Sequence, residues 1–352
     1  MVHVDVAPRQ RSYQTPGFAG YNVAWSPFFA EKFAVVGAAN YGLVGNGRLH
    51  IFGRNASLPL KFFDSQDGMF DLAWSELHEN QIASACGDGS IKLWDISLNE
   101  HPIRNWAEHT REVQSLDWNN MQKELFASSS WDGTVKIVRD SGCVPNNQWN
   151  PDIPQSIQTI QAHSACVYKC AWSPHNPTLI ASASGDGSVA FFDLRNGHGP
   201  GGLRPVTSLP VGGEVLSMDW NKYRPMTLAT GSTDRAVKIW DGRMPSTAPQ
   251  TRLTQPLTEK CVLTGHQYAV RGLSWSTHQP SVLASAGYDM SVRIWNVDDA
   301  QPHGAVPVLD TPRNVYPLHK EFVVGLAYSL FEPNVIASTS WDCETHIWPT
   351  GV

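Results

Sequence analysis

A short pattern of apolar and polar positions recurs along the chain. In Ile82–Asp95, IASACGDGSIKLWD, apolar and small residues precede Gly87-Asp88-Gly89, and a second run follows with apolar residues at alternate positions. An Asp-Gly pair between two such runs favours a tight turn, because the turns that match strand twist need positive φ. The segment is therefore predicted to be a β-hairpin.

The same pattern returns five more times. The further copies are Phe126–Val138, Ile180–Asp193, Leu228–Asp241, Leu283–Asn296 and Ile336–Trp348. The turn aspartates of the six copies are Asp88, Asp132, Asp186, Asp234, Asp289 and Asp342. Neighbouring turn aspartates lie 44 to 55 residues apart. A repeat of that length made of strands is typical of a β-propeller.

Each unit opens with a strand that ends in Trp-Ser or a similar pair. Seven such strands are present: Val23–Ser26, Leu72–Ser75, Leu116–Trp118, Cys170–Ser173, Met218–Trp220, Leu273–Ser276 and Leu326–Ser329. The additional one belongs to a first unit whose hairpin, Phe33–Phe52, has Asn40 and a longer Gly-rich turn instead of the aspartate turn. Seven units of four strands predict an all-β, seven-bladed propeller.

The two ends of the chain are predicted to meet in the last blade. The last unit ends at His346–Val352 after its third strand, which would leave a sheet edge unpaired. Residues Arg11–Thr15 belong to no blade of their own and can supply the missing strand. A closed array makes residues 1–352 a single domain. Its blades span approximately 18–63, 64–107, 108–161, 162–210, 211–264, 265–318, and 319–352 with 11–15.

The two faces of the predicted disc differ in their loops. Long segments rich in Pro, Gly and polar residues follow the third strands of several blades: Ser141–Pro154, Asn196–Pro205, Gly242–Pro256 and Asp298–Pro312. All of them leave from the same end of a blade and therefore lie on one face. The opposite face carries only tight turns and short links, so it is expected to be smoother and better suited to docking a ligand.

Composition and charge argue against several classes of protein. Charged residues make up 16% of the chain and the net charge is −6, so it lacks the basic surface that nucleic acid attracts. The first ten residues show no secretory signal, and no stretch reaches the roughly 20 apolar residues that cross a bilayer. The six cysteines include no CxxC pair and are expected to be buried thiols. No cofactor, metal site, nucleic-acid partner or membrane insertion is predicted.

Four histidines each stand a few residues before an opening strand: His109, His163, His266 and His319. The units resemble the WD-repeat family, in which such a histidine joins a Ser, the turn Asp and a Trp in a buried network. By this resemblance two networks are complete: His266, Ser285, Asp289 and Trp295, and His319, Ser338, Asp342 and Trp348. Blades three and four have Val138 and Phe192 at the Trp position, and blades two and five lack the histidine.

A His–Ser–Asp trio can also indicate a hydrolase. Here the trio recurs in several blades, whereas a catalytic triad is built once beside an oxyanion hole. The chain has no phosphate loop, no GxSxG and no HExxH. The trio is therefore interpreted as structural, and no enzymatic activity is predicted.

Parts of the sequence are more specific than the generic repeat. The informative segments are Gly17–Phe29, Leu43–Phe52, Asp67–Glu76, His109–Trp118, Ser128–Ile137 and His319–Asp342. From about Phe18 onward the chain resembles the peroxin-7 family, the WD-repeat receptors for type-2 peroxisomal targeting signals. The segment LVGNGRLHIF in the irregular first blade is the most specific match. Departures lie in Asn196–Pro205 and Gly242–Pro256, which leaves the partners of that face open.

The resemblance implies a function. Such receptors bind a nonapeptide of the form Arg-Leu-x5-His-Leu near the N-terminus of cargo enzymes. They act with an import co-receptor, meet docking-complex proteins at the peroxisomal membrane, and shuttle between the cytosol and the peroxisome. The spacing of the signal places its four anchors on one side of a helix, which suits recognition of a helix in a groove.

Three positions per blade are expected to reach the smoother face. Two lie where the opening strand begins and one precedes the turn aspartate. The apolar candidates for peptide binding are Tyr21, Phe70, Trp131, Tyr168, Leu216, Tyr288 and Trp341, and the acidic ones are Asp67, Glu112 and Glu214. Exposed aromatic clusters mark binding sites, although each residue alone could be half-buried blade packing. Glu112 is the favoured partner for the Arg of the signal, the alternative being a solvated rim.

Two other kinds of function remain open from the sequence. One is a generic WD-repeat scaffold within a multiprotein signalling or chromatin complex, against which the irregular first blade argues. The other is a propeller enzyme or lectin-like site, which would need a polar or metal-bearing central channel. No cluster of metal ligands in the sequence supports it.

Overall fold

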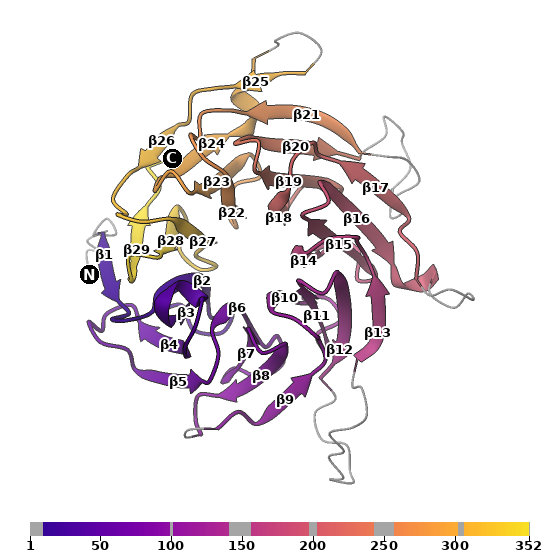
Figure 1. Cartoon of the computed structure of the whole chain (residues 1–352). Coiled ribbons are helices and arrows are strands. Elements are labelled where there is room, and N and C mark those ends of the chain that lie inside the picture. Colours follow the sequence, from indigo (N-terminus) through magenta and orange to yellow (C-terminus); the bar gives the residue numbers. More distant parts are fainter. Residues whose placement is uncertain are drawn as a thin grey trace, which may run out of the picture.

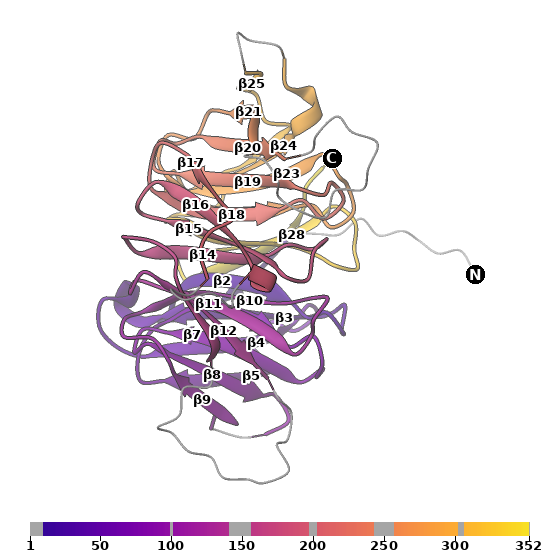
Figure 2. The ribbon, with the colours of Figure 1, turned by 90° about the vertical axis from the view of Figure 1, so that its right-hand side faces the viewer.

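Seven β-sheets stand around a central axis in the computed structural model (Figure 1). The structure describes residues 10–98, 101–140, 156–196, 203–242, 257–301 and 306–351. Within these ranges six sheets have four strands and one has five. Figure 2 shows the disc from its edge. The predicted seven-bladed propeller is confirmed.

Each blade has four antiparallel strands, and the strand that opens the blade lies nearest the axis (Figure 1); blade five adds a fifth strand in parallel. Blade one contains β2 (Ala19–Trp25), β3 (Lys32–Ala38), β4 (Gly47–Gly53) and β5 (Lys61–Ser65). Blade two contains β6 (Met69–Trp74), β7 (Gln81–Cys86), β8 (Ser90–Asp95) and β9 (Arg104–Ala107). Blade three contains β10 (Val113–Trp118), β11 (Leu125–Ser130), β12 (Thr134–Arg139) and β13 (Ser156–Gln161).

The remaining blades follow the same order. Blade four contains β14 (Val167–Trp172), β15 (Leu179–Ser184), β16 (Ser188–Asp193) and β17 (Thr207–Pro210). Blade five contains β18 (Val215–Trp220), β19 (Thr227–Ser232), β20 (Val237–Asp241), β21 (Thr258–Leu263) and β25 (Val308–Leu309). Blade six contains β22 (Val270–Trp275), β23 (Val282–Gly287), β24 (Val292–Asn296) and β26 (Asn314–Tyr316). Short 3-10 helices are η1 (Ala39–Gly42), η2 (Leu194–Asn196) and η3 (Val297–Asp299).

Blade seven joins the two ends of the chain. It contains β27 (Val323–Tyr328), β28 (Val335–Ser340), β29 (Glu344–Pro349) and, as its outer strand, β1 (Arg11–Gln14). β1 pairs antiparallel with β29, and Tyr13 is buried against Phe33 and Phe52 of blade one. The prediction that the N-terminal strand closes the last blade is confirmed.

The tryptophan that ends the opening strand ties neighbouring blades together. In blades two, five and six its Nε1 donates to a carbonyl on the innermost strand of the preceding blade: Trp74 to Ala24 at 3.2 Å, Trp220 to Ala171 at 3.2 Å and Trp275 to Asp219 at 3.1 Å. The bond from Trp25 to Ala327, at 3.1 Å, continues this pattern from blade one to blade seven. The ring is thus closed by a contact that also ties blades two, five and six to the blades before them. Burying such large side chains contributes on the order of 2 kcal/mol each.

The long loops predicted on one face are only partly described. Ser141–Pro154 lies outside the described residues, as do residues 197–202, 243–256 and 302–305 within the other three segments. The described part of Asp298–Pro312 corrects one expectation, because it is not all loop. Val308–Leu309 forms β25, which pairs in parallel with Val262–Leu263 on the edge of blade five.

Candidate functional site

A chain of hydrogen bonds repeats in the interior of the blades. In blade six the Trp295 Nε1–H donates to Ser285 Oγ at 2.8 Å, and Ser285 Oγ lies 2.7 Å from His266 Nε2. His266 Nδ1 lies 2.9 Å from Asp289 Oδ2. Because an ionised carboxylate only accepts, the neutral imidazole donates its Nδ1–H to Asp289; its Nε2 then accepts from the serine hydroxyl, whose oxygen accepts from the indole. The indole, hydroxyl and imidazole groups of this series each have a hydrogen-bond partner.

Blade seven repeats this arrangement with the other predicted quartet. His319 Nδ1 lies 3.0 Å from Asp342, and Trp348 Nε1 donates to Ser338 Oγ at 3.2 Å. The histidine–serine–aspartate part also forms around His109 and His163, where no tryptophan takes part. The His–Ser–Asp trio thus occurs in four blades, and in each blade its atoms hold a turn. This arrangement differs from a catalytic triad, which is built once at one site.

In blades two and five, which lack the histidine, a lysine pairs with the turn aspartate. Lys92 Nζ lies 2.9 Å from Asp88, and Lys238 Nζ lies 2.9 Å from Asp234. Burial disfavours the charged aspartates, but hydrogen bonds from neighbouring hydroxyls and from the lysines hold the pKa of Asp88 and of Asp234 below the usual range. This role of the two lysines was not predicted, although each stands two residues before the tryptophan, in KLW and KIW, of a blade that lacks the histidine.

The upper face is defined here as the face that carries the turns between second and third strands. At its centre every innermost strand has a β-bulge near its start, and the register of pairing skips one residue per blade. The seven unpaired residues are Tyr21, Phe70, Gln114, Tyr168, Leu216, Arg271 and Val324. A bulge re-aims its side chain and often lies beside a binding site. Here the bulges form a ring at the mouth of the central channel.

Five predicted or neighbouring aromatic residues form a continuous array on the upper face. Its ring-centre distances are 4.9 Å for Phe70–Tyr21, 5.6 Å for Tyr21–Trp341, 5.3 Å for Trp341–Phe322 and 4.7 Å for Phe322–Tyr288. The array crosses blades two, one, seven and six, and all five side chains are half-buried. Aromatic rings at these separations form a rigid apolar surface. We call these five residues the aromatic array.

A second aromatic pair lies on blades three and four. The rings of Trp131 and Tyr168 are 6.4 Å apart, edge to face. The Arg111 guanidinium lies 5.6 Å from the Trp131 ring, and that of Arg271 lies 5.9 Å from the Tyr168 ring. The pair therefore differs from the aromatic array in having cations beside it.

The irregular turn of blade one completes the upper face. Asn40, Tyr41 and Gly42 all have positive φ, which turns the chain tightly. At Gly42 any side chain would collide, because a Cβ there would lie 2.8 Å from the Tyr21 hydroxyl oxygen and 2.9 Å from Phe70. The turn therefore lies directly on the aromatic array.

The same turn carries an aromatic residue that the sequence analysis did not predict. Tyr41 is 51% exposed, and its ring lies 5.7 Å from Trp341. The Tyr21 hydroxyl donates to the Tyr41 carbonyl at 2.7 Å. Leu43 and Val44, next along the chain, are 84% and 75% exposed. The apolar surface of the aromatic array thus continues onto this turn.

The three predicted carboxylates have different surroundings. Glu112 Oε2 lies 3.6 Å from Arg111 Nε, so its charge is already partly balanced. Asp67 accepts a hydrogen bond from the Gly68 amide at 2.7 Å, and Glu214 is exposed. Within the described ranges neither Asp67 nor Glu214 has an ion-pair partner. Both are available to a cation.

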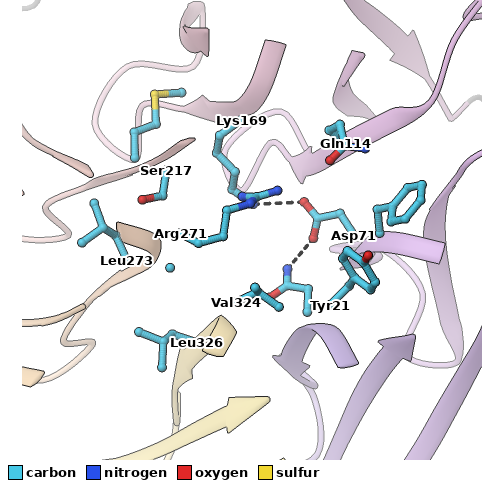
Figure 3. Close-up of a pocket in the computed structure, with 13 residues that line it drawn as sticks. Tyr21, Asp71, Gln114, Lys169, Ser217, Arg271, Leu273, Val324 and Leu326 are labelled. Atoms are coloured by element: carbon cyan, nitrogen blue, oxygen red, sulfur yellow. Dashed lines mark hydrogen bonds and ion pairs between the residues drawn. The ribbon is translucent and has the colours of Figure 1, made fainter. Parts of the chain in front are cut away.

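A cavity of about 70 Å³ lies in the channel beneath the ring of bulges (Figure 3). Tyr21, Gln114 and Arg271 line its upper part. Below them Lys169 Nζ reaches across to Asp71 Oδ2 at 3.0 Å, and Asp71 also accepts from Asn22. This ion pair joins blades two and four inside the channel. It gives the aromatic face a rigid, polar floor.

One predicted anchor is poorly placed for contact. Leu216 is only 5% exposed, and the Arg271 side chain donates from Nη1 to its carbonyl at 2.9 Å. The Arg271 side chain is therefore more accessible to a ligand than that of Leu216. Because Arg271 is remote from Leu216 in sequence, spacing alone could not reveal that it covers this position.

The described part of the chain contains neither a cluster of metal ligands nor a candidate membrane-spanning helix. There, no group of three or more His, Cys, Asp or Glu side chains is arranged to hold a metal ion. Among the same residues, no helix has the length and apolar character that crossing a membrane requires.

Comparison with known proteins gives two consistent findings. The model of the WD domain, G-beta repeat, matches residues 58–95, 100–138, 154–193, 203–241 and 257–296, which are parts of blades one to six. The chain is 36% identical to the peroxisomal targeting signal 2 receptor of Saccharomyces cerevisiae, covering 96% of this chain and 98% of that protein. It is 37% identical to the human receptor of the same name, over 90% and 88% of the two chains. It is 38% identical to peroxisome biogenesis protein 7 of Arabidopsis thaliana, over 95% and 96%.

Proposed function

The chain belongs to the WD-repeat family of peroxisomal targeting signal 2 receptors, and we propose that its upper face binds the helical Arg-Leu-x5-His-Leu signal of cargo enzymes. In this proposal the protein is an import receptor without catalytic activity. With a co-receptor it delivers cargo from the cytosol to docking proteins at the peroxisomal membrane and then returns.

The observation that carries the proposal is the aromatic array around the irregular turn of blade one. Phe70, Tyr21, Trp341, Phe322 and Tyr288 are in mutual contact and half-buried, and Tyr41 extends them outward. Monomeric proteins seldom leave such a surface open unless it binds something. The turn that replaces the regular aspartate hairpin packs on this array and adds Tyr41 to it, which a regular repeat would not do.

The dimensions of the signal suit this surface. Nine helical residues are about 13 Å long. Anchors at the first, second, eighth and ninth positions lie on one side of the helix. The two leucines can pack on aromatic rings, and rigid aromatic anchors typically dominate the energy of such contacts. The array and the Trp131–Tyr168 pair offer such rings on both sides of the channel mouth.

Charge would set the direction of the bound helix. The signal carries Arg at its first position, and the upper face offers Glu112, Glu214 and Asp67. Complementary charges chiefly fix register and exclude wrong partners. Glu112 remains the favoured partner, since its backbone carbonyl accepts from the Trp131 amide at 3.1 Å and it therefore lies beside that residue. Its ion pair with Arg111 weakens its field, so Asp67 and Glu214 are the alternatives.

Binding of a fluorescein-labelled Arg-Leu-x5-His-Leu peptide to the full chain, with and without cell extract as a source of co-receptor, tests the proposal. The control peptide has Glu at both anchor positions one and eight. We expect saturable binding of the signal only, strengthened by extract. Equal binding of both peptides would contradict the proposal.

Charge reversal identifies the acidic partner. Glu112→Lys should abolish binding of the Arg signal, and a signal with Glu at its first position should recover part of it. The matched controls are Glu214→Lys and Asp67→Lys, tested with the same two peptides. If the reversed signal gains affinity only on one of these controls, that residue, and not Glu112, holds the arginine.

The alternative function, a generic scaffold, makes a different prediction for affinity capture. A receptor should retain enzymes that carry the signal, and synthetic signal peptide should release them. A scaffold should retain a fixed set of complex subunits that the peptide leaves bound.

A further inference from the structure

The face opposite the upper face, which we call the lower face, carries a sevenfold ring of equivalent positions. In each turn between first and second strands, a Ser or Asn side chain accepts from the amide of the residue two positions later. Those residues are Phe28, Leu77, Met121, His175, Tyr223, His278 and Phe331. The turn bond fixes each backbone and holds the side chain at the same place in every blade.

Five of the seven ring residues are large and apolar, and each of these five is between 40% and 50% exposed. Single exposed apolar residues need no explanation. An apolar residue at the same position of five separate blades, around one opening, is a surface of the kind that binds a partner. Leu330, beside Phe331, is also exposed and extends it.

Two members of the ring, His175 and Tyr223, lie at the lower end of the central channel. A cavity of about 720 Å³ opens there, lined by residues that include Tyr223, Leu330, Asp117, Asp219 and Lys222. It is separate from the upper cavity, because both end at the same layer of side chains: Lys169, Met218, Leu273 and Leu326. A ligand on the lower face would therefore leave the upper face free.

The charges of this opening do not cancel. Asp219 is paired with Lys222 at 2.7 Å, and Glu76 lies 3.9 Å from Lys123. Lys169 is engaged by Asp71 on the upper side. Asp117 accepts the Trp172 amide at 2.6 Å with one oxygen, and in the described part of the chain it has no ion-pair partner. Among Glu76, Asp117 and Asp219, Asp117 is thus the one carboxyl group that forms no ion pair with another described residue.

Burial raises the pKa of Asp117 to about 7, although the hydrogen bond from the Trp172 amide and the nearby charges of Lys169 and Lys222 act to lower it. A carboxyl whose ionised form is disfavoured in this way gains most when a cation docks beside it. The apolar ring and the acidic centre together define the chemistry of the missing partner.

We propose that the lower mouth of the channel is a second protein-docking site, which takes a segment with one Lys or Arg flanked by large apolar residues. The basic side chain enters the opening toward Asp117, and its apolar neighbours pack on Met121, Tyr223 and Phe331. This site is independent of the peptide bound on the upper face, so the receptor can hold cargo and a second partner together.

The test uses defined peptides and the full chain. A fluorescein-labelled peptide Leu-Phe-Lys-Phe-Leu is compared by anisotropy with versions that carry Glu or norleucine at the centre. We expect the Lys peptide to bind about tenfold more tightly than the Glu peptide, the size of one partly desolvated ion pair. Equal binding of the Lys and Glu peptides would overturn the proposal without any variant.

Variants locate the effect. Asp117→Asn keeps the acceptor for the Trp172 amide and should reduce the Lys-to-Glu preference to about twofold or less, as expected when only weak, screened surface charges remain.

Met121→Ser should weaken binding of all three peptides. Its matched control is Ile157→Ser, since Met121 and Ile157 are both 50% exposed, but Ile157 lies on the outer strand β13. A preference that survives Asp117→Asn, or equal losses from Met121→Ser and Ile157→Ser, would place the peptide elsewhere. Binding of the upper-face signal does not enter this test, so the two proposals can fail separately.

Discussion

The blade interior and the upper face each hold tryptophan among the described residues, and its surroundings differ between these two regions. Trp295 in blade six is fully buried, and its Nε1 donates to Ser285. Trp131 in the turn of blade three is half-buried, and its Nε1 has no hydrogen-bond partner among the described residues. Its ring meets Tyr168 and Arg111 instead.

Carboxylates divide in the same way. Asp289 is held by His266 in the interior, whereas Glu214 on the upper face has no ion-pair partner within the described ranges. Features that repeat from blade to blade close the ring and satisfy buried groups. Features that change from blade to blade, such as the turn at Tyr41, form the candidate site. Stability and binding should therefore respond to different substitutions.

The largest expected effect is on stability. Trp295→Ala removes a buried ring and leaves Ser285 without its donor, so the free energy of unfolding should fall by about 3–5 kcal/mol. Urea unfolding measures the loss. At low urea the folded fraction should still bind signal peptide with unchanged affinity. A loss of affinity without a loss of stability would mean that the interior and the upper face are not separable.

The matched substitution on the upper face, Trp131→Ala, should affect peptide affinity more than stability. Trp131→Ala should weaken binding of the signal peptide by about 2 kcal/mol, or roughly 30-fold, because a rigid aromatic anchor is lost. Its melting temperature should change much less than that of Trp295→Ala. Fluorescence anisotropy measures the affinity. Wild-type affinity in both Trp131→Ala and Tyr168→Ala would move the groove away from this pair.

Acid should affect the interior more than the upper face. Burial opposes ionisation of Asp342, but hydrogen bonds from His319 and from the Lys320 amide hold the pKa of Asp342 below its usual range. A depressed carboxyl pKa contributes stability that is complete above the unfolded value, near 4, and is lost as the pH falls through the folded value.

Unfolding free energy should therefore fall between about pH 4.5 and 3, by on the order of 1 kcal/mol for each such turn aspartate. Asp342→Asn should flatten this dependence in part, because five other turn aspartates remain. Urea titrations at both pH values provide the measurement. A variant with the full wild-type slope would show that Asp342 does not contribute to it.

Much of the fold could be predicted from the sequence because its signals are local. The turn aspartates, from Asp88 to Asp342, and the aromatic residues that end the opening strands recur once in each unit, so a unit can be recognised from short stretches of sequence. The closing strand Arg11–Gln14 followed from simple counting of strands. The pairing of β25 with blade five did not, since Val308 and Val262 are remote in sequence.

The candidate site was predicted less completely. Four of the seven bulge residues, Tyr21, Phe70, Tyr168 and Leu216, were among the predicted candidates, although nothing in the spacing revealed that they are bulges. Tyr41 was missed because its turn has no equivalent in the other blades. The Arg111 contact that partly balances Glu112, and the Arg271 contact over Leu216, depend on how side chains of different elements meet. Such contacts leave no periodic signal.

Photo-crosslinking tests the central claim, that the upper face holds the signal, most directly. A signal peptide with benzoylphenylalanine in place of its second anchor is bound to the full chain, irradiated, and the linked residues are identified by mass spectrometry. The account predicts crosslinks to the upper face, in the segments around Tyr21, Trp131, Tyr168 or Trp341, which unlabelled signal suppresses. Suppressible crosslinks confined to the lower-face ring or to the outer strands would contradict it.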